Sequence, residues 1–277
     1  MKHLNYNEDI LFFDNIDIAE ITKSIKTPFY LYSENAIVEN INNYMSSASD
    51  RTLFCYSVKA NSNLSLLKII ASHGMGFDIV SKGELHRAIK AGVNTKKIVY
   101  SGVGKTKEEI SYALNNNILC FNVESEEELI AINKQATLMK VIADISIRVN
   151  PDVETKTHPY ISTGMKENKF GIPYDDAFAI FKKAHKLSSL NILGIDFHIG
   201  SQIMSTAPYL ESISSVKKLI NKLKKANINI SHIDVGGGLG VAYKNEEAVS
   251  KPNFIKSITN ALSDYDLDII FEPGRSI

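Results

Sequence analysis

This 277-residue sequence has no excess of charge of either sign, no long apolar run and only two cysteines. Its 31 Lys and Arg residues balance 31 Asp and Glu residues, so nothing in the net charge favours nucleic acid or an anionic membrane as a partner. No apolar run approaches the roughly 18 residues of a membrane span, and residues 1–9 lack the apolar core of a signal peptide. We therefore expect a cytoplasmic protein without a nucleic-acid or membrane partner.

The two cysteines, Cys55 and Cys120, lie inside apolar runs and lack the spacing of metal ligands. This placement favours reduced, packed thiols over a disulfide or a zinc site. The acidic run at residues 126–128 follows Ser125, and we interpret it as a solvated helix start rather than a metal site. Repeats, low-complexity segments and flexible linkers are also missing. The sequence thus predicts a metal-free globular protein of one large or two ordinary α/β domains.

From Leu53 onward, short apolar runs alternate with amphipathic stretches, which is typical of parallel strands joined by crossover helices. The predicted strands are 53–58, 77–80, 97–101, 118–123, 144–149, 192–197, 231–235 and 267–272. The predicted helices between them are 64–73, 81–91, 106–115, 125–135, 175–187 and 208–226. Eight strands in this alternation predict a closed (β/α)8 barrel.

The region before the barrel pattern has its own local signals. Residues 29–32 are aromatic and β-prone, which predicts a strand. Ser33 has the side chain of an N-cap, without a capping box, for a helix that carries Ile37, Ile41 and Tyr44 at helical spacing.

Polar residues of functional types occur where the predicted strands end. In a barrel of this kind the chemistry lies at the carboxyl ends of the strands. The residues at these ends are Lys59, Asp78, Arg148, Asn150, His198 and Glu272, with glycines after the seventh strand. We therefore expect a single site at this end of the barrel.

Lys59 follows the first predicted barrel strand and precedes a polar turn, Asn61-Ser62-Asn63. A lysine that reaches into an apolar cavity has a disfavoured charged form, so a neutral, nucleophilic amine becomes accessible near neutral pH. An imine with an aldehyde cofactor requires such an amine. The alternative is a solvated lysine at a strand end.

A glycine-rich turn, Gly236-Gly237-Gly238, follows the strand that carries Asp234. Glycines let the backbone N–H groups approach an anion such as phosphate, although a plain tight turn has the same pattern. Ser201 and Arg275 follow neighbouring strands, and Arg holds phosphate oxygens in a fixed geometry. Together these residues predict a site for one phosphate group.

Glu272 ends the last strand, where its carboxylate could face a pyridine nitrogen and keep it protonated. The alternative is an ion pair with Arg275 in the turn. His198 ends the sixth strand, where its ring could stack on an aromatic cofactor. A hydrogen-bonded core histidine is the alternative there.

Seven segments in fixed order make the sequence resemble the diaminopimelate decarboxylases, which are barrel-type decarboxylases dependent on pyridoxal 5′-phosphate. The segments are YSVKANSN, GFDIVSKGEL, SGVGKT, RVNPDVETKTHPYISTGMKENKFGI, FHIGSQI, DVGGGLG and EPGR. The resemblance covers nearly the whole chain, from about Thr27 onward. It implies a (β/α)8 barrel of the alanine racemase and ornithine decarboxylase type.

The resemblance also implies the roles of individual residues. Lys59 would bind the cofactor as an imine, His198 would stack on its ring, and Glu272 would pair with its nitrogen, which makes these three the catalytic residues. The implied cofactor-binding positions are Lys59, Asp78, Arg148, His198, Ser201, Gly236, Gly237, Gly238, Glu272, Pro273, Gly274 and Arg275. Arg275 would also reach the substrate.

The implied reaction is the decarboxylation of meso-2,6-diaminopimelate to L-lysine, the last step of lysine biosynthesis. The block at 158–171 matches a loop that lies over the active site in that family, and it favours diaminopimelate over ornithine or arginine. A related decarboxylase of ornithine, arginine or carboxynorspermidine is the first alternative. A non-catalytic barrel that binds a protein partner is the second.

The chain departs from the family after Arg275, because it ends at Ile277. Relatives continue into a β domain that supplies substrate-binding residues and a cysteine donated across a homodimer interface. We therefore expect a fragment with impaired turnover, in which residues 33–277 form the cofactor-binding barrel. Residues 1–32 would pair with the missing β domain and leave an exposed sheet edge. A homodimer is expected for the full-length protein.

Overall fold

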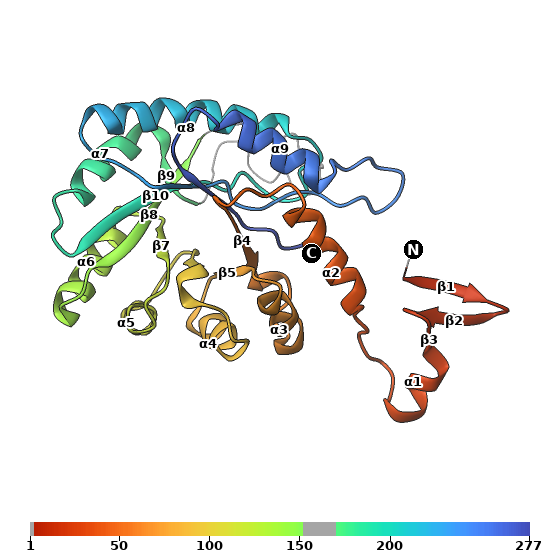
Figure 1. Cartoon of the computed structure of the whole chain (residues 1–277). Helices are drawn as coiled ribbons and strands as arrows, with labels where there is room; N and C mark the ends of the chain where they lie inside the picture. Colours follow the sequence, from red (N-terminus) through yellow and green to blue (C-terminus); the bar gives the residue numbers. More distant parts are fainter. Residues whose placement is uncertain (1–2, 152–169) are drawn as a thin grey trace.

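Eight parallel strands close into a barrel in the computed structural model, which describes residues 3–151 and 170–277 (Figure 1). In barrel order they are β4 (Thr52–Ser57), β5 (Gly76–Ile79), β6 (Ile98–Tyr100), β7 (Cys120–Val123), β8 (Ala143–Asn150), β10 (Leu190–Asp196), β11 (His232–Asp234) and β12 (Asp268–Phe271). Pairing of β10 with β8 and of β12 with β4 closes the ring. Every strand lies within two residues of its predicted position, so the predicted barrel is confirmed.

Helices surround the barrel (Figure 1). They are α2 (Glu34–Met45), α3 (Leu64–Ser72), α4 (Lys82–Lys90), α5 (Lys107–Asn115), α6 (Glu126–Met139), α7 (Tyr174–Ala184), α8 (Ala207–Lys225) and α9 (Lys251–Ala261). The sequence predicted all of these except α9. A two-residue strand, β9 (Ile172–Pro173), pairs with the end of β8. In the described ranges, no helix has the length and apolar character needed to traverse a bilayer.

Side-chain caps set the starts of several helices. Ser33 Oγ accepts from Ala36 N at 2.9 Å and starts α2, as predicted. Ser125 Oγ accepts from Glu128 N at 3.1 Å, which confirms the predicted helix start at the acidic run. Satisfying these otherwise unpaired N–H groups fixes where each connecting loop ends and each helix begins.

Side chains on one face of the barrel strands form two successive layers, one apolar and one polar. The apolar layer consists of Cys55, Val99, Cys120 and Ile270, which pack together and are buried. Both cysteines are free thiols with no exposed surface, as predicted. Two residues further along the same strands come Ser57, Ser101, Asn122 and Glu272, all buried. The side chains at i and i+2 point to the same face, so these polar groups gather above the apolar layer.

The first residues fold beside the barrel. Strands β1 (Leu4–Asn7), β2 (Ile10–Phe13) and β3 (Ile16–Asp17) form an antiparallel sheet, and α1 (Ile18–Ser24) follows. The strand predicted at 29–32 was wrong, because this segment has no strand partner and Tyr30 is 90% exposed. Aromatic and β-prone residues form a strand only where a neighbouring backbone supplies the hydrogen bonds.

His232 on β11 is buried, and its Nε2 has no hydrogen-bond partner in the described part of the chain. Gly194 on β10 makes room for the imidazole, because a Cβ at that position would lie 2.3 Å from ring atoms of His232. Burial lowers the pKa of His232 to about 4, against the opposing effect of Asp268 and Asp144. The ring is therefore neutral near pH 7.

We expect acid to destabilise the fold through His232. The unfolded chain has an ordinary His pKa of about 6.5, so it binds the extra proton first. The contribution to stability is complete above that pH and is lost as the pH falls toward 4. Between pH 7.5 and 4.5, the free energy of unfolding should fall by about 2–3 kcal/mol more in the wild type than in His232→Leu. Urea titrations measure this difference, with the exposed His86→Leu as control. Equal falls in the wild type and His232→Leu would contradict the expectation.

Candidate active site

A cavity of about 400 Å³ opens at the carboxyl ends of the barrel strands. It is lined by Ser57, Lys59, Ala60, His198, Ser201, Gln202, Gly238, Leu239, Glu272, Gly274 and Arg275. The structure therefore brings together seven of the twelve residues predicted to bind the cofactor. The other five, Asp78, Arg148, Gly236, Gly237 and Pro273, lie in the layer behind this lining. Residues 158–169 of the predicted substrate loop lie outside the described residues.

Lys59 lies in a short 3-10 turn, η1 (Val58–Ala60), directly after β4. Its Nζ donates to Asp78 Oδ2 at 2.6 Å, and Asp78 is fully buried at the end of β5. Ser57 Oγ donates to the same carboxylate oxygen at 2.8 Å. The amine is therefore directed toward the buried carboxylate of Asp78 and not along the outside of the barrel.

The expectation of a neutral Lys59 amine was wrong for this state of the protein. Burial does lower the pKa of Lys59, but the carboxylates of Asp78 and Glu272 outweigh burial and raise this pKa above its usual range. The cavity wall at the lysine is an ion pair and not an apolar surface. Before Nζ can act as a nucleophile, its proton has to leave. Asp78 does not favour this loss, because, although burial acts in the opposite direction, the Lys59 charge and hydrogen bond hold the pKa of the Asp78 carboxyl below its usual value.

The turn Gly236–Gly238 packs against neighbouring backbone so closely that no side chain fits. A Cβ on Gly237 would lie 2.1 Å from the carbonyl oxygen of Glu272. A Cβ on Gly238 would lie 2.0 Å from the carbonyl oxygen of Gly200, and this residue also has φ of +96°. Asp234 Oδ1 accepts from Gly236 N at 2.9 Å and holds the start of the turn. Gly238 lies at the cavity end of this turn and lines the cavity together with Ser201.

His198 is held as a neutral ring by the same turn. Gly237 N donates to His198 Nδ1 at 3.2 Å, so Nδ1 carries no proton and the ring proton is on Nε2. Burial and the positive charges of Arg148 and Lys59 lower the pKa of His198 to about 3. A flat, uncharged ring thus lines the cavity.

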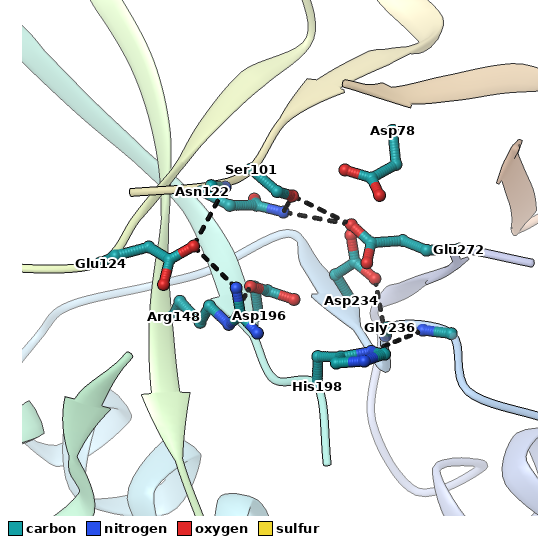
Figure 2. A network of polar contacts seen from close by, with 12 residues as sticks. Asp78, Ser101, Asn122, Glu124, Arg148, Asp196, His198, Asp234, Gly236 and Glu272 are labelled. Atoms are coloured by element: carbon teal, nitrogen blue, oxygen red, sulfur yellow. Dashed lines mark hydrogen bonds and ion pairs between the residues drawn. The ribbon is translucent and has the colours of Figure 1, made fainter. Parts of the chain in front are cut away.

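Glu272 lines the cavity, is almost fully buried and has neutral hydrogen-bond partners (Figure 2). Its Oε1 accepts from Ser101 Oγ at 3.3 Å and from Asn122 Nδ2 at 3.4 Å. Burial and the nearby Asp234 carboxyl raise the pKa of Glu272 well above its usual range. Its hydrogen bonds run to Ser101 and Asn122, whereas Arg275 donates to Tyr243 at 2.5 Å, so the predicted alternative of a Glu272–Arg275 pair was wrong.

Arg148 on β8 supports the site from behind (Figure 2). Its Nη1 donates to Glu124 Oε1 at 2.7 Å, and its Nε lies 3.6 Å from Asp196 Oδ2. Glu124 Oε1 also accepts from Gly102 N at 3.0 Å. These contacts tie the ends of β7, β8 and β10 together, and Arg148 itself is not part of the cavity lining.

Sequence reasoning missed several residues of this polar layer: Ser57, Ser101, Asn122, Glu124, Asp196 and Tyr243. The first three could have been found, because each lies two residues after a buried apolar residue of a predicted strand. Tyr243 carries no such signal, since it lies in a loop.

The comparisons with known proteins agree with this geometry. The family described as "Pyridoxal-dependent decarboxylase, pyridoxal binding domain" matches residues 34–277. A diaminopimelate decarboxylase of Vibrio cholerae is 46% identical over 280 residues, which covers 100% of this chain and 67% of that protein. One of Pseudomonas aeruginosa is 44% identical, again over 100% of this chain and 67% of the relative. The chain thus spans about two thirds of the length of these relatives.

Solved structures are similar over the same part. The crystal structure of diaminopimelate decarboxylase from Helicobacter pylori complexed with L-lysine superimposes with a TM-score of 0.89 at 46% identity. The similarity covers 94% of this chain and 66% of that one. Lysine decarboxylase from Selenomonas ruminantium gives a TM-score of 0.83 at 25% identity, over 98% of this chain and 67% of the other.

Proposed function

The chain belongs to the pyridoxal-dependent decarboxylase family, and on this premise we propose that it serves the decarboxylation of meso-2,6-diaminopimelate to L-lysine and carbon dioxide. One observation carries the proposal: the amine of Lys59, the carboxyl of Glu272 and Gly238 of the glycine turn meet at one cavity. Similar proteins are named diaminopimelate decarboxylases, which supports diaminopimelate as the substrate. Because the chain spans about two thirds of these relatives, turnover and the expected homodimer are proposed for the whole protein.

The residues present fit pyridoxal 5′-phosphate. The aldehyde of this cofactor reacts with an amine, its pyridine nitrogen pairs with a carboxyl group, and its phosphate is bound by N–H groups and by arginine. Lys59, Glu272 and Arg275 all line the cavity, together with Ser201 and with Gly238 of the glycine turn. Lys59 would hold the cofactor covalently, Glu272 would bind the ring nitrogen, and the turn with Ser201 and Arg275 would hold the phosphate.

When bound, the cofactor supplies a protonated ring that stabilises the carbanion left after loss of carbon dioxide. The chain's own residues control protons around it. Asp78 Oδ2, at 2.6 Å from Lys59 Nζ, would hold this amine in position at the cavity. Glu272 would keep a proton on the ring nitrogen, and the neutral His198 would add no positive charge against that cationic ring. Arg148 would hold the carboxylates behind the ring in place through its contacts to Glu124 and Asp196.

A comparison of substrates tests the proposal. The chain would be joined to the remaining third of the Vibrio cholerae relative, loaded with pyridoxal phosphate, and assayed for carbon dioxide release. We expect release from meso-2,6-diaminopimelate with L-lysine as product, at least about tenfold faster in kcat/KM than from ornithine or arginine, a difference of about 1.4 kcal/mol. Faster release from ornithine or arginine would assign a related decarboxylase instead. No uptake of cofactor by the chain would favour a non-catalytic barrel.

A further inference from the structure

Buried carboxyl groups outnumber the cations that reach them at the mouth of the barrel (Figure 2). Five carboxyl side chains there are at most 6% exposed: Asp78, Glu124, Asp196, Asp234 and Glu272. The cations among them are Lys59, which pairs with Asp78, and Arg148, which pairs with Glu124 and lies near Asp196. Asp234 and Glu272 remain without a cation in this part of the described chain. Buried charges without a counter-ion are costly, so some of these groups have to be neutral.

Asp234 and Glu272 are close neighbours. Together with Asp196, each places one carboxylate oxygen within 4.8 Å of the others. Asp234 Oδ1 accepts from Gly236 N, while the fully buried Oδ2 has no hydrogen-bond partner in the described residues. Two carboxylates at such a separation in a buried site do not both ionise, because one charge strongly raises the pKa of the other group.

We infer that Asp234 and Glu272 share one proton, and that Asp234 is a positioning residue that carries this proton when Glu272 acts as the ionised partner of a ring nitrogen. The second part of this inference rests on the proposed function. Asp234 would then keep a single negative charge at the ring nitrogen in place of two. The unpartnered Oδ2 is the atom on which the proton would reside.

The pKa shifts agree with the geometry. Burial and the negative charge of Asp78 raise the pKa of Asp234 to about 7. The titratable groups that interact with Asp234 are Cys55, Asp78, Cys120, Asp196 and Glu272. Four further groups interact with these neighbours of Asp234: Lys59, Glu124, Arg148 and His198. Most of the groups that are charged near neutral pH are acids, so their net effect is to favour the protonated form of Asp234.

The shared proton can be tested on the chain without cofactor. A carboxyl whose pKa is raised in the folded state contributes stability below its unfolded pKa of about 3.9, and this contribution is lost as the pH rises through about 7. Asp234→Asn retains the acceptor for Gly236 N and mimics the protonated acid. Relative to the wild type, the urea midpoint of Asp234→Asn should therefore rise between pH 4.5 and 8. The exposed Asp264→Asn should show no such rise. A difference curve for Asp234→Asn that is flat over this range overturns the inference.

The wild type alone gives a second readout that does not depend on folding of the variant. Infrared spectra should show the C=O band of a protonated carboxyl persisting at pH 6, and its amplitude should decrease between pH 6 and 8. Absence of that band at pH 6 overturns the inference.

Cofactor binding separates this inference from the proposed function. Asp234→Asn should bind pyridoxal phosphate within about threefold of the wild type, because the neutral amide replaces a neutral acid. Loss of binding in Asp234→Asn would mean that Asp234 acts as a charge, which overturns its positioning role. If the wild type itself takes up no cofactor while the pH-dependent stability is found, the shared proton stands and the proposed function fails.

Discussion

Alanine in place of Lys59 is expected to abolish covalent attachment of pyridoxal phosphate and to lower decarboxylation by at least about 10³-fold, the order expected when a covalent nucleophile is removed. Lys59 lines the cavity, and its Nζ lies 2.6 Å from the Asp78 carboxylate, which would hold the amine in position. Borohydride reduction of the loaded protein followed by peptide mass analysis measures attachment at this position.

The control for that experiment is Lys68→Ala, which removes an exposed lysine of α3 and should leave labelling of Lys59 unchanged. Removing the Lys59 amine also leaves the buried Asp78 without its cation. The double variant Lys59→Ala, Asp78→Asn removes this unpaired charge and keeps the protein folded for the same assay. Full labelling in either Lys59 variant, or labelling of a different lysine in the wild type, would contradict the assignment of Lys59.

Alanine at Gly238 is expected to weaken binding of pyridoxal phosphate by about 10²-fold or more, equivalent to about 3 kcal/mol. The new Cβ would lie 2.0 Å from the carbonyl oxygen of Gly200, and backbone oxygens cannot move aside as side chains do. The φ of +96° adds strain for any residue with a side chain. The turn would have to shift, and Gly238 would leave its place in the cavity lining. Cofactor titration by absorbance measures the affinity.

Gly92→Ala separates backbone strain from steric overlap. Gly92 has a φ of +88°, similar to that of Gly238, but a Cβ there would meet no atom within 4 Å. This control should lose stability of about 1 kcal/mol and keep the cofactor affinity of the wild type. Equal effects of the two substitutions on affinity would show that the close approach of the turn to Gly200 has no role in binding.

Much of the fold could be predicted because the signals are local. Buried parallel strands form continuous apolar runs, and helices begin at caps such as Ser33 and Ser125, so both are readable over a few residues. The failures have the opposite cause. Residues 29–32 have strand-like side chains, but a strand needs a partner that the local sequence does not specify. Helix α9 was missed although Ser250 caps it and Phe254, Ile255 and Ile258 are buried.

The candidate site was predicted by residue type and position more successfully than by charge. Lys59 and Glu272 were placed correctly at strand ends, and both line the cavity. The ionisation of Lys59 was predicted in the wrong direction, because Asp78 lies 19 residues away in the sequence and 2.6 Å away in the structure. The orientation of Arg275 toward Tyr243, 32 residues earlier, was invisible for the same reason.

What the sequence by itself determined is the barrel and the polar residues at its carboxyl ends. Side chains alternate between the two faces of a strand, so the sequence shows which side chains share a face. Parallel strands bring their carboxyl ends to the same end of the barrel. Only the tertiary structure decided which of these groups carry protons and which pair with one another. Protonation depends on burial and on neighbours brought from different strands, as with Asp234 on β11 and Glu272 after β12, and neither quantity is encoded in any short stretch of sequence.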